Sequence, residues 1–557
     1  MIKSLPQGMT IITSACGNDD YTDISRLAAR NIPCNHNRNG TQCEVCREIA
    51  EVELEIEGLH SRLMALHEKH RTLRIKRNNS YNIISKLPYD IVSNIFLLCL
   101  PQIDKERSPD DRDCLDFSTP CLPLTLGAVC DSWRRLVHSI PRLWTTISID
   151  IYKSNLQGVS HYLQLSRSAT LVVRLHAHSD YASASVSVRI LDVITLVKQN
   201  LYRMAFLCID LPCQYMKAFS RQGLDTPKNL PILEELHLHC SSQMCTVSHD
   251  FTISIDPPRP HRVVLSSSSI KNMQLDWSSL RHLSFDVVGW HPSESLITDA
   301  LSLLSKGKWL QVVDFCIDIP GVLRPLSGMP RILTQNSIHN LRLYGYIATI
   351  FLKHTTMPNL VSLSLWEMTL HTTSLFLSFL QRSACPLTTL DLRFDKLEQE
   401  IIKFFRSTPK LQHLALDITR AHVDSEKHIV RFLEHLHMVI PRDSESASVQ
   451  LGNHSQDMFL PLLRKFIYAG PMVHAPPSLF LDVVEARSGP FPTSEGDQVT
   501  QPLEEFIAYH LKPEEPLTER DRQRILRLNA AGKKVSVLEF HTDCEKINTH
   551  FPASYYH

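Results

Sequence analysis

The sequence predicts an α/β protein, in which a long N-terminal helix and a small helical unit precede a solenoid of short repeats. Three observations lead to this prediction. Apolar residues recur at helical spacing from Ile49 onward, two amphipathic segments lie between residues 80 and 145, and one short apolar pattern returns many times after Trp144. A chain of 557 residues also exceeds the roughly 250 to 300 residues that one hydrophobic core usually serves.

Composition and charge exclude several classes of partner. The 43% hydrophobic content suits a folded protein, and 58 basic residues balance 58 acidic ones, so no overall field attracts nucleic acid or an anionic membrane. No stretch reaches the roughly 18 apolar residues that span a bilayer, and the N-terminus makes a poor signal peptide. We therefore expect a cytoplasmic or nuclear protein with reduced cysteines, no membrane partner and no nucleic-acid partner.

Residues 1–46 show no periodicity and are predicted to be a disordered tail. The tail contains four residues of the types that zinc accepts, namely Cys34, His36, Cys43 and Cys46. Their spacing fits no common zinc finger, so we predict no metal site there and leave open whether these residues bind a metal. The alternative is a tail that carries reduced thiols.

Residues 47–78 are predicted to form a coiled-coil-like helix. The first half is acidic and the second half basic, an order that favours an antiparallel second copy paired through residues 49–73. The alternative is a helix that folds back onto its own chain, and both interpretations stay open. The apolar positions follow a three-four alternation in which His70 fills the one missing place, and they are Ile49, Val52, Ile56, Leu59, Leu63, Leu66 and Leu73.

The next segment, residues 80–145, contains two predicted amphipathic helices separated by a charged loop at 102–122. Pro88 stands where a helix needs no amide donor, and Asp90 supplies an acid in the first turn. The second predicted helix is amphipathic and carries Leu126, Val129, Cys130, Trp133 and Val137.

These residues resemble the F-box. The motif positions stand here as Leu87-Pro88, Asp90, Ile91, Ile95-Phe96, Val129-Cys130, Trp133-Arg134, Pro141 and Leu143-Trp144. The chain departs from the family in the inserted loop 102–122. This insertion, together with the preceding helix, looks like the large fungal F-box families.

The resemblance implies a non-catalytic subunit of a ubiquitin ligase complex, which binds a Skp-family adaptor and, through it, a cullin scaffold. The residues that it assigns to adaptor binding are Leu87, Pro88, Ile91, Ile95, Phe96, Val129 and Trp133. The alternative is that these apolar side chains only form the first layer of the repeat core.

From residue 146 to 440 the pattern L-x-x-L-x-L recurs, with its last four intervals at 28, 22, 27 and 24 residues. This period is typical of leucine-rich repeats, so we predict a leucine-rich-repeat solenoid with one short strand per repeat. The Asn or Cys that regularly follows the last leucine is absent, which predicts an irregular horseshoe. Residues 441–557 are predicted to add C-terminal repeats, among them Val535/Leu538/Phe540, and a cap, with a disordered loop near 488–502.

Three residues that directly follow the L-x-L pattern on successive repeats are Tyr344, Trp366 and Arg393. Adjacent strands lie about 4.8 Å apart, and interfaces favour these residue types. We therefore predict a patch that binds an unknown target protein. The alternative is that the three side chains only pack across neighbouring repeats.

No phosphate-binding loop, dinucleotide-binding motif or H-E-x-x-H motif is present, so we expect neither an enzyme nor a cofactor. Histidines beside the repeat leucines, such as His237 and His239, are expected to be cross-strand neighbours. Two functions stay open: the substrate-recognition adaptor of an SCF-type (cullin-RING) E3 ligase, and a ligase-independent repeat scaffold that oligomerises through its N-terminal helix.

Overall fold

The computed structural model divides the chain into two compact units, Met1–Asn94 and Ile95–His557. It describes residues 44–81, 84–100, 122–151, 156–176, 184–216, 232–240, 257–266, 273, 275–288, 294–318, 332–345, 347–368, 372–394, 401–418, 426–437, 459–470, 477–488, 501–510 and 517–539. The predicted tail, the inserted loop and the loop near 488–502 therefore lie outside the described residues, except at their edges.

The first unit contains helix α2, Glu44–Tyr81, and a short 3₁₀ turn, Ile84–Lys86. The helix is a few residues longer at each end than the predicted 47–78. Its seven seam residues, from Ile49 to Leu73, are each 45 to 59% exposed. Within the first unit the described residues leave this seam uncovered, and whether it pairs with a second copy or folds back onto its own chain stays a prediction.

Helix α3, Tyr89–Leu98, is followed by α4, Leu122–Val129, and α5, Asp131–Ser139. The prediction of a single second helix is wrong, because Cys130 separates α4 from α5. Cys130 has an extended backbone, φ −162° and ψ 169°, and its Sγ accepts a hydrogen bond from the Trp133 N–H at 3.5 Å. The residue thus caps α5 instead of continuing α4. A 3₁₀ turn, Pro141–Trp144, leads into the sheet.

The second unit is built on a 14-stranded sheet in which every strand pairs in parallel with its neighbour in chain order. Such an order is that of a solenoid-like α/β fold. The strands are β1 Thr146–Asp150, β2 Leu171–His176, β3 Met204–Leu211, β4 Glu235–Cys240, β5 Arg262–Ser266, β6 His282–Val288, β7 Val312–Asp318, β9 Asn340–Tyr344, β11 Ser362–Met368, β12 Thr389–Phe394, β13 His413–Asp417, β14 Lys465–Gly470, β15 Glu505–His510 and β16 Lys534–Glu539.

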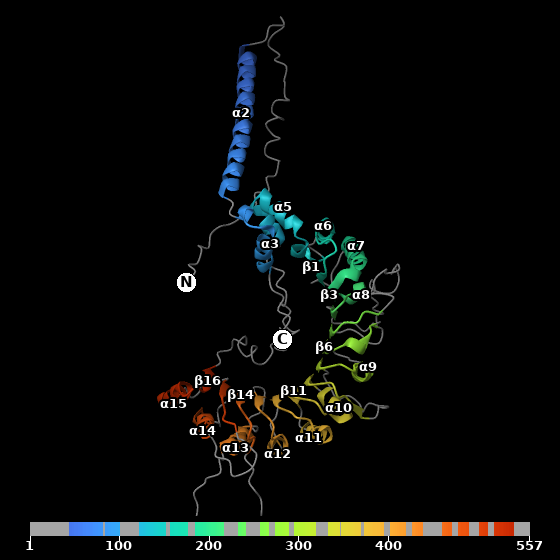
Figure 1. Cartoon of the computed structure of the whole chain (residues 1–557), viewed down its shortest axis with the longest axis vertical. Coiled ribbons are helices and arrows are strands. Elements are labelled where there is room, and N and C mark those ends of the chain that lie inside the picture. Colours follow the sequence, from blue (N-terminus) through green and yellow to red (C-terminus); the bar gives the residue numbers. More distant parts are fainter. Residues whose placement is uncertain are drawn as a thin grey trace, which may run out of the picture. The chain divides into compact units, whose positions relative to one another are not determined.

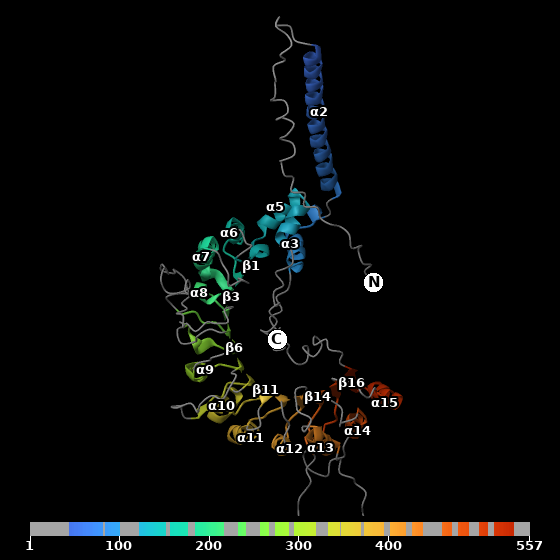
Figure 2. The same cartoon turned by 180° about the vertical axis from the view of Figure 1, so that it is seen from behind.

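Helices lie along one side of this sheet, as Figures 1 and 2 show. A separate two-stranded sheet is formed by β8, Leu333–Thr334, and β10, Thr355–Thr356. The helices of the repeats are α6 Leu156–Leu165, α7 Ala184–Gln199, α8 Cys213–Met216, α9 Glu294–Lys306, α10 Ile347–His354, α11 Thr372–Ser383, α12 Ile401–Arg406, α13 Glu426–His437, α14 Pro477–Ala486 and α15 Glu519–Ala530.

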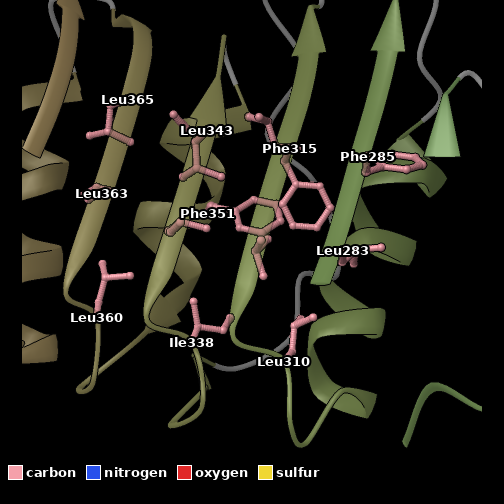
Figure 3. Close-up of a cluster of buried hydrophobic side chains, with 14 of the residues drawn as sticks. Leu283, Phe285, Leu310, Phe315, Ile338, Leu343, Phe351, Leu360, Leu363 and Leu365 are labelled. Carbon is pink, nitrogen blue, oxygen red and sulfur yellow. The ribbon is translucent and has the colours of Figure 1, made fainter. Parts of the chain in front are cut away.

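The core is one continuous apolar layer between strands and helices, which runs from Ile147 to Val535. Alternate residues of each strand point into it, as expected for a pleated strand. Figure 3 shows the leucines and phenylalanines of β6, β7, β9 and β11 in this layer, with Phe351 of α10 lying 4.8 Å from Phe315, ring centre to ring centre. Each repeat therefore buries its apolar residues only against its neighbours.

Most predicted repeat strands are present, with three differences. The pattern missed β2 and β5, because Thr170 and Pro260 occupy the position where the template has its first leucine. In the last repeat, Val535 is a core residue as predicted, Leu538 is not, and Phe540 lies outside the described residues. Val535 and Val537 align with the core residues of β15, whereas Leu538 is exposed.

The turns between repeats are held by individual buried polar side chains. Arg203 donates from Nη2 to the Leu163 carbonyl at 2.8 Å and from Nη1 to Ser166 Oγ at 3.0 Å. Arg487, fully buried, donates to the Leu460 carbonyl. The bonds to the Leu163 and Leu460 carbonyls satisfy groups at helix or turn ends that would otherwise be costly to bury.

Candidate partner-binding surfaces

Helix α3 has two apolar faces, one buried and one exposed. Val92 and Phe96 are each only 1% exposed. Ile91, Ile95 and Leu98, which share the other face at spacings of four and three, are 47%, 37% and 74% exposed. A short helix with an apolar face open to solvent is a candidate docking element.

The sequence before α3 explains why the helix begins where it does. The Pro88 carbonyl accepts hydrogen bonds from the Ile91 and Val92 N–H groups, each at 3.1 Å. Asp90 lies in the first turn, where a negative charge favours the helix dipole. Leu87, half-buried, donates its N–H to the Ile84 carbonyl, and Pro88 is exposed. The start of the exposed stripe is therefore fixed by local sequence.

Two of the seven residues predicted for adaptor binding point inward instead. Phe96 packs on Trp133 of α5, with ring centres 5.0 Å apart. Phe96 is buried and Trp133 half-buried, so this pair serves the interior of the second unit, and the prediction of Phe96 as a direct contact is corrected accordingly. Val129, at the end of α4, is exposed, as is Leu124 on the same helix.

The end of the helical segment is joined firmly to the first repeat. Trp144 is completely buried, and its Nε1 donates a hydrogen bond to the Val137 carbonyl of α5 at 2.9 Å. Its ring meets Tyr162 of α6 edge-on, with centres 4.7 Å apart. Because one side chain contacts both elements, α5 and the first repeat are expected to move together.

The predicted target patch is corrected by the structure. Tyr344, Trp366 and Arg393 do lie side by side on β9, β11 and β12, but they are only 8%, 5% and 2% exposed. Tyr344 and Trp366 meet edge-on at 6.4 Å, and Cys316 of β7 completes the cluster. The alternative of packing across neighbouring repeats is therefore what the structure shows.

We call the side of the strands turned away from the leucine core the far face; it carries Cys316, Tyr344, Trp366, Asp391 and Arg393. Arg393 lies 5.1 Å above the Trp366 ring, and its Nε is 2.7 Å from Asp417 Oδ2. Trp366 Nε1 donates to Asp391 Oδ2 at 3.1 Å. Burial raises the pKa of Asp391 to about 6, although the Trp366 hydrogen bond and Arg393 act in the opposite direction.

With that cluster buried, the repeats offer a different exposed aromatic side chain. Trp309, which follows α9, is 68% exposed. It borders a shallow hollow with Ser305 and Lys308 on one side, and Gln335 and His339 on the other. Sequence reasoning missed Trp309 because it lies in the turn before the strand, outside the repeated pattern.

Metal-ligating residue types also come together on the far face. Cys208 of β3 and His237 and His239 of β4 have donor atoms within 4.8 Å of one another. The sequence analysis treated these histidines as cross-strand neighbours and predicted no metal ligands among them. Of the tail residues, Cys34, His36 and Cys43 lie outside the described residues, and Cys46 is half-buried on α2.

Comparisons with known proteins add no assignment. No family model matches the chain, and a search of curated proteins finds no match. Among the described helices, none combines the length and the apolar character that a bilayer crossing requires.

Proposed function

We propose that this chain is the substrate-recognition adaptor of an SCF-type (cullin-RING) E3 ubiquitin ligase. In this proposal, an F-box at residues 80–145 binds a Skp-family adaptor, and a leucine-rich-repeat horseshoe binds the target protein. The chain itself performs no chemistry. The observation that carries the proposal is the exposed apolar face of α3, with Ile91, Ile95 and Leu98, which begins directly after Leu87-Pro88.

The free energy available from this face is sufficient only if it is buried together with other anchors. Complete burial contributes at most about 1.5 to 3 kcal/mol for each of Ile91, Ile95 and Leu98, or roughly 5 to 9 kcal/mol in all. Association costs about 4 to 15 kcal/mol. Further exposed apolar side chains, such as Leu124 and Val129 on α4, are therefore expected to contribute.

The repeats support the second half of the proposal. Fourteen parallel strands in chain order create a long surface, as target-binding solenoids require. The buried Trp144 joins α5 to the first repeat within the second unit. We propose the hollow beside Trp309 as a target contact, in place of the buried Tyr344, Trp366 and Arg393.

Adaptor capture tests the proposal. The full chain is co-expressed with a Skp-family adaptor and a cullin, and both are measured after purification through a tag on the chain. We expect Ile95→Glu to reduce the captured adaptor at least about tenfold, since 1.4 kcal/mol corresponds to a factor of ten and a carboxylate buried in an apolar interface costs more than this.

Leu526→Glu is the matched control, because Leu526 is also an exposed aliphatic residue on a helix, at the other end of the chain. It should leave capture unchanged. Both variants should keep the wild-type circular dichroism spectrum, because both residues are exposed. Equal capture by Ile95→Glu and Leu526→Glu, or no adaptor with the wild-type chain, would contradict the proposal.

A second candidate function is a ligase-independent scaffold that oligomerises through α2. The exposed seam of α2, from Ile49 to Leu73, favours it. The adaptor-capture measurement distinguishes the two candidate functions, because the scaffold hypothesis predicts that the wild-type chain captures no adaptor at all.

A further inference from the structure

The register of two neighbouring strands brings a thiol and two imidazoles together on the far face. Cys208 of β3 pairs with His237 of β4. His239 lies two residues farther along β4, so it points to the same side as His237. Their chain neighbours Leu207, Ile209, Leu236 and Leu238 belong to the leucine core, which places the three ligand-type residues on the opposite face.

The separation of the three donor atoms is close to what a metal ion needs. One donor from each residue lies within 4.8 Å of the other two. Around a tetrahedral zinc ion, with Zn–S of about 2.3 Å and Zn–N of about 2.0 to 2.1 Å, donors lie about 3.3 to 3.6 Å apart. Rotation of the side chains by little more than 1 Å at the donor atoms would therefore close the site, with no movement of the strands.

The surroundings of His237 suit a ligand. Its Nε2 is buried and makes no hydrogen bond within the described part of the chain. A buried nitrogen left in this way costs free energy, which a bound cation would recover. Glu235, on the same face of β4, has its Oε2 3.8 Å from this nitrogen. A cation bound at this nitrogen would also lie close to the negative charge of Glu235, which favours its binding.

We propose that Cys208, His237 and His239 bind a zinc ion, with the fourth position left for water. One thiolate and two imidazoles are borderline-soft donors that zinc accepts. Three protein ligands and one open position are also the arrangement in which zinc keeps an exchangeable site. The continuous apolar core already holds β3 to β4, so the ion is not needed for folding.

The test uses the full chain with the tail thiols removed by Cys34→Ser, Cys43→Ser and Cys46→Ser. After chelation and dialysis, Zn²⁺ is titrated by calorimetry, and we expect one ion per chain. Loss of a residue that only hydrogen-bonds to a ligand typically weakens metal binding about 10- to 100-fold. Loss of a direct ligand is expected to weaken binding at least as much as the upper end of this range. Each of Cys208→Ser, His237→Gln and His239→Gln should therefore raise the dissociation constant at least about 100-fold.

Two control variants match these changes in chemistry. Cys316→Ser removes another buried far-face thiol, on β7, and His413→Gln removes another strand histidine, on β13. Both should bind zinc as the background chain does. With Co²⁺ as the probe, the background chain should show tetrahedral visible absorption and a thiolate charge-transfer band, and Cys208→Ser should lose the band.

Two results would overturn the proposal. One is a background chain that binds no zinc, because the three tail substitutions do not touch the site. The other is zinc binding that all three ligand variants retain with unchanged affinity, which would place the ion elsewhere in the chain.

Discussion

At the scale of single residues, the position within the strand pattern decides on which face of the sheet a side chain lies. Its burial then decides whether it can contact a partner. Tyr344, Trp366 and Arg393 were predicted to lie next to one another, and they do. Their exposure could not be predicted, because it depends on what packs around them rather than on their own sequence. Burial in the same cluster also raises the pKa of the Asp391 carboxyl.

The raised pKa of Asp391 predicts a pH-dependent stability. At pH values below the ordinary value of 3.8, this carboxyl is neutral in both the folded and the unfolded chain. Between 3.8 and about 6 the folded chain holds an extra proton, so stability falls as the pH rises through this window. Two pKa units correspond to about 3 kcal/mol, which is the upper limit of the loss.

Asp391→Asn should remove this loss and keep the hydrogen bond, since an amide oxygen also accepts from Trp366 Nε1. Urea midpoints of the wild type and the variant, measured at pH 4 and pH 7, test the prediction. We expect the urea midpoint of the variant, relative to that of the wild type, to be higher at pH 7 than at pH 4. A difference that stays constant across this range, or that reverses, would refute the assigned ionisation.

At the scale of elements, periodicity predicted the long helix α2, the helices between residues 80 and 145 and most strands, whereas most helices of the repeats were not predicted individually. Cys130 divides the predicted second helix, since it caps α5. The strands β2 and β5 were not predicted, because Thr170 and Pro260 stand where the repeat pattern has its first leucine. The long helix α2 was predicted nearly in full, because its three-four alternation of apolar residues, interrupted only at His70, lies within one short stretch.

The exposed seam of α2 predicts self-association of the full chain. We expect sedimentation velocity to show a concentration-dependent dimer, which Leu63→Asp shifts to monomer because it places a charge in the apolar seam. Met64→Asp is the matched control, since Met64 is also an exposed apolar residue and lies one position away from the seam. A wild-type chain that stays monomeric at high micromolar concentration would leave the seam without this role.

At the scale of the whole second unit, each repeat contacts only its neighbours, so damage should stay local. Gly470, at the end of β14, tests this. A Cβ there would lie 2.5 Å from Ile418 Cγ1 and 2.7 Å from Tyr468 Oη, a clash that requires the backbone or Ile418 to shift. Gly470→Ala should therefore loosen the repeats around β13 to β15 while the repeats near β1 to β6 keep their stability.

Hydrogen exchange resolved by peptide measures this gradient. We expect faster exchange in residues 459–510 of Gly470→Ala and unchanged exchange in residues 146–288. Gly158→Ala is the control, because a Cβ on this α6 residue meets no atom within 4 Å. Uniformly faster exchange along the solenoid would show instead that the repeats unfold as one cooperative body.

The sequence by itself determined the long N-terminal helix, most of the strands and the order in which they follow, because the periodicity of these elements is contained in a few adjacent residues. It also predicted the stacked parallel strands, since repeats of this length bury their leucines only against one another. The tertiary structure alone decided that Phe96 and Trp366 are buried, that Ile95 is exposed, and that Cys208 meets His237 and His239. Those outcomes depend on register and packing between segments distant in the chain, which no local pattern records.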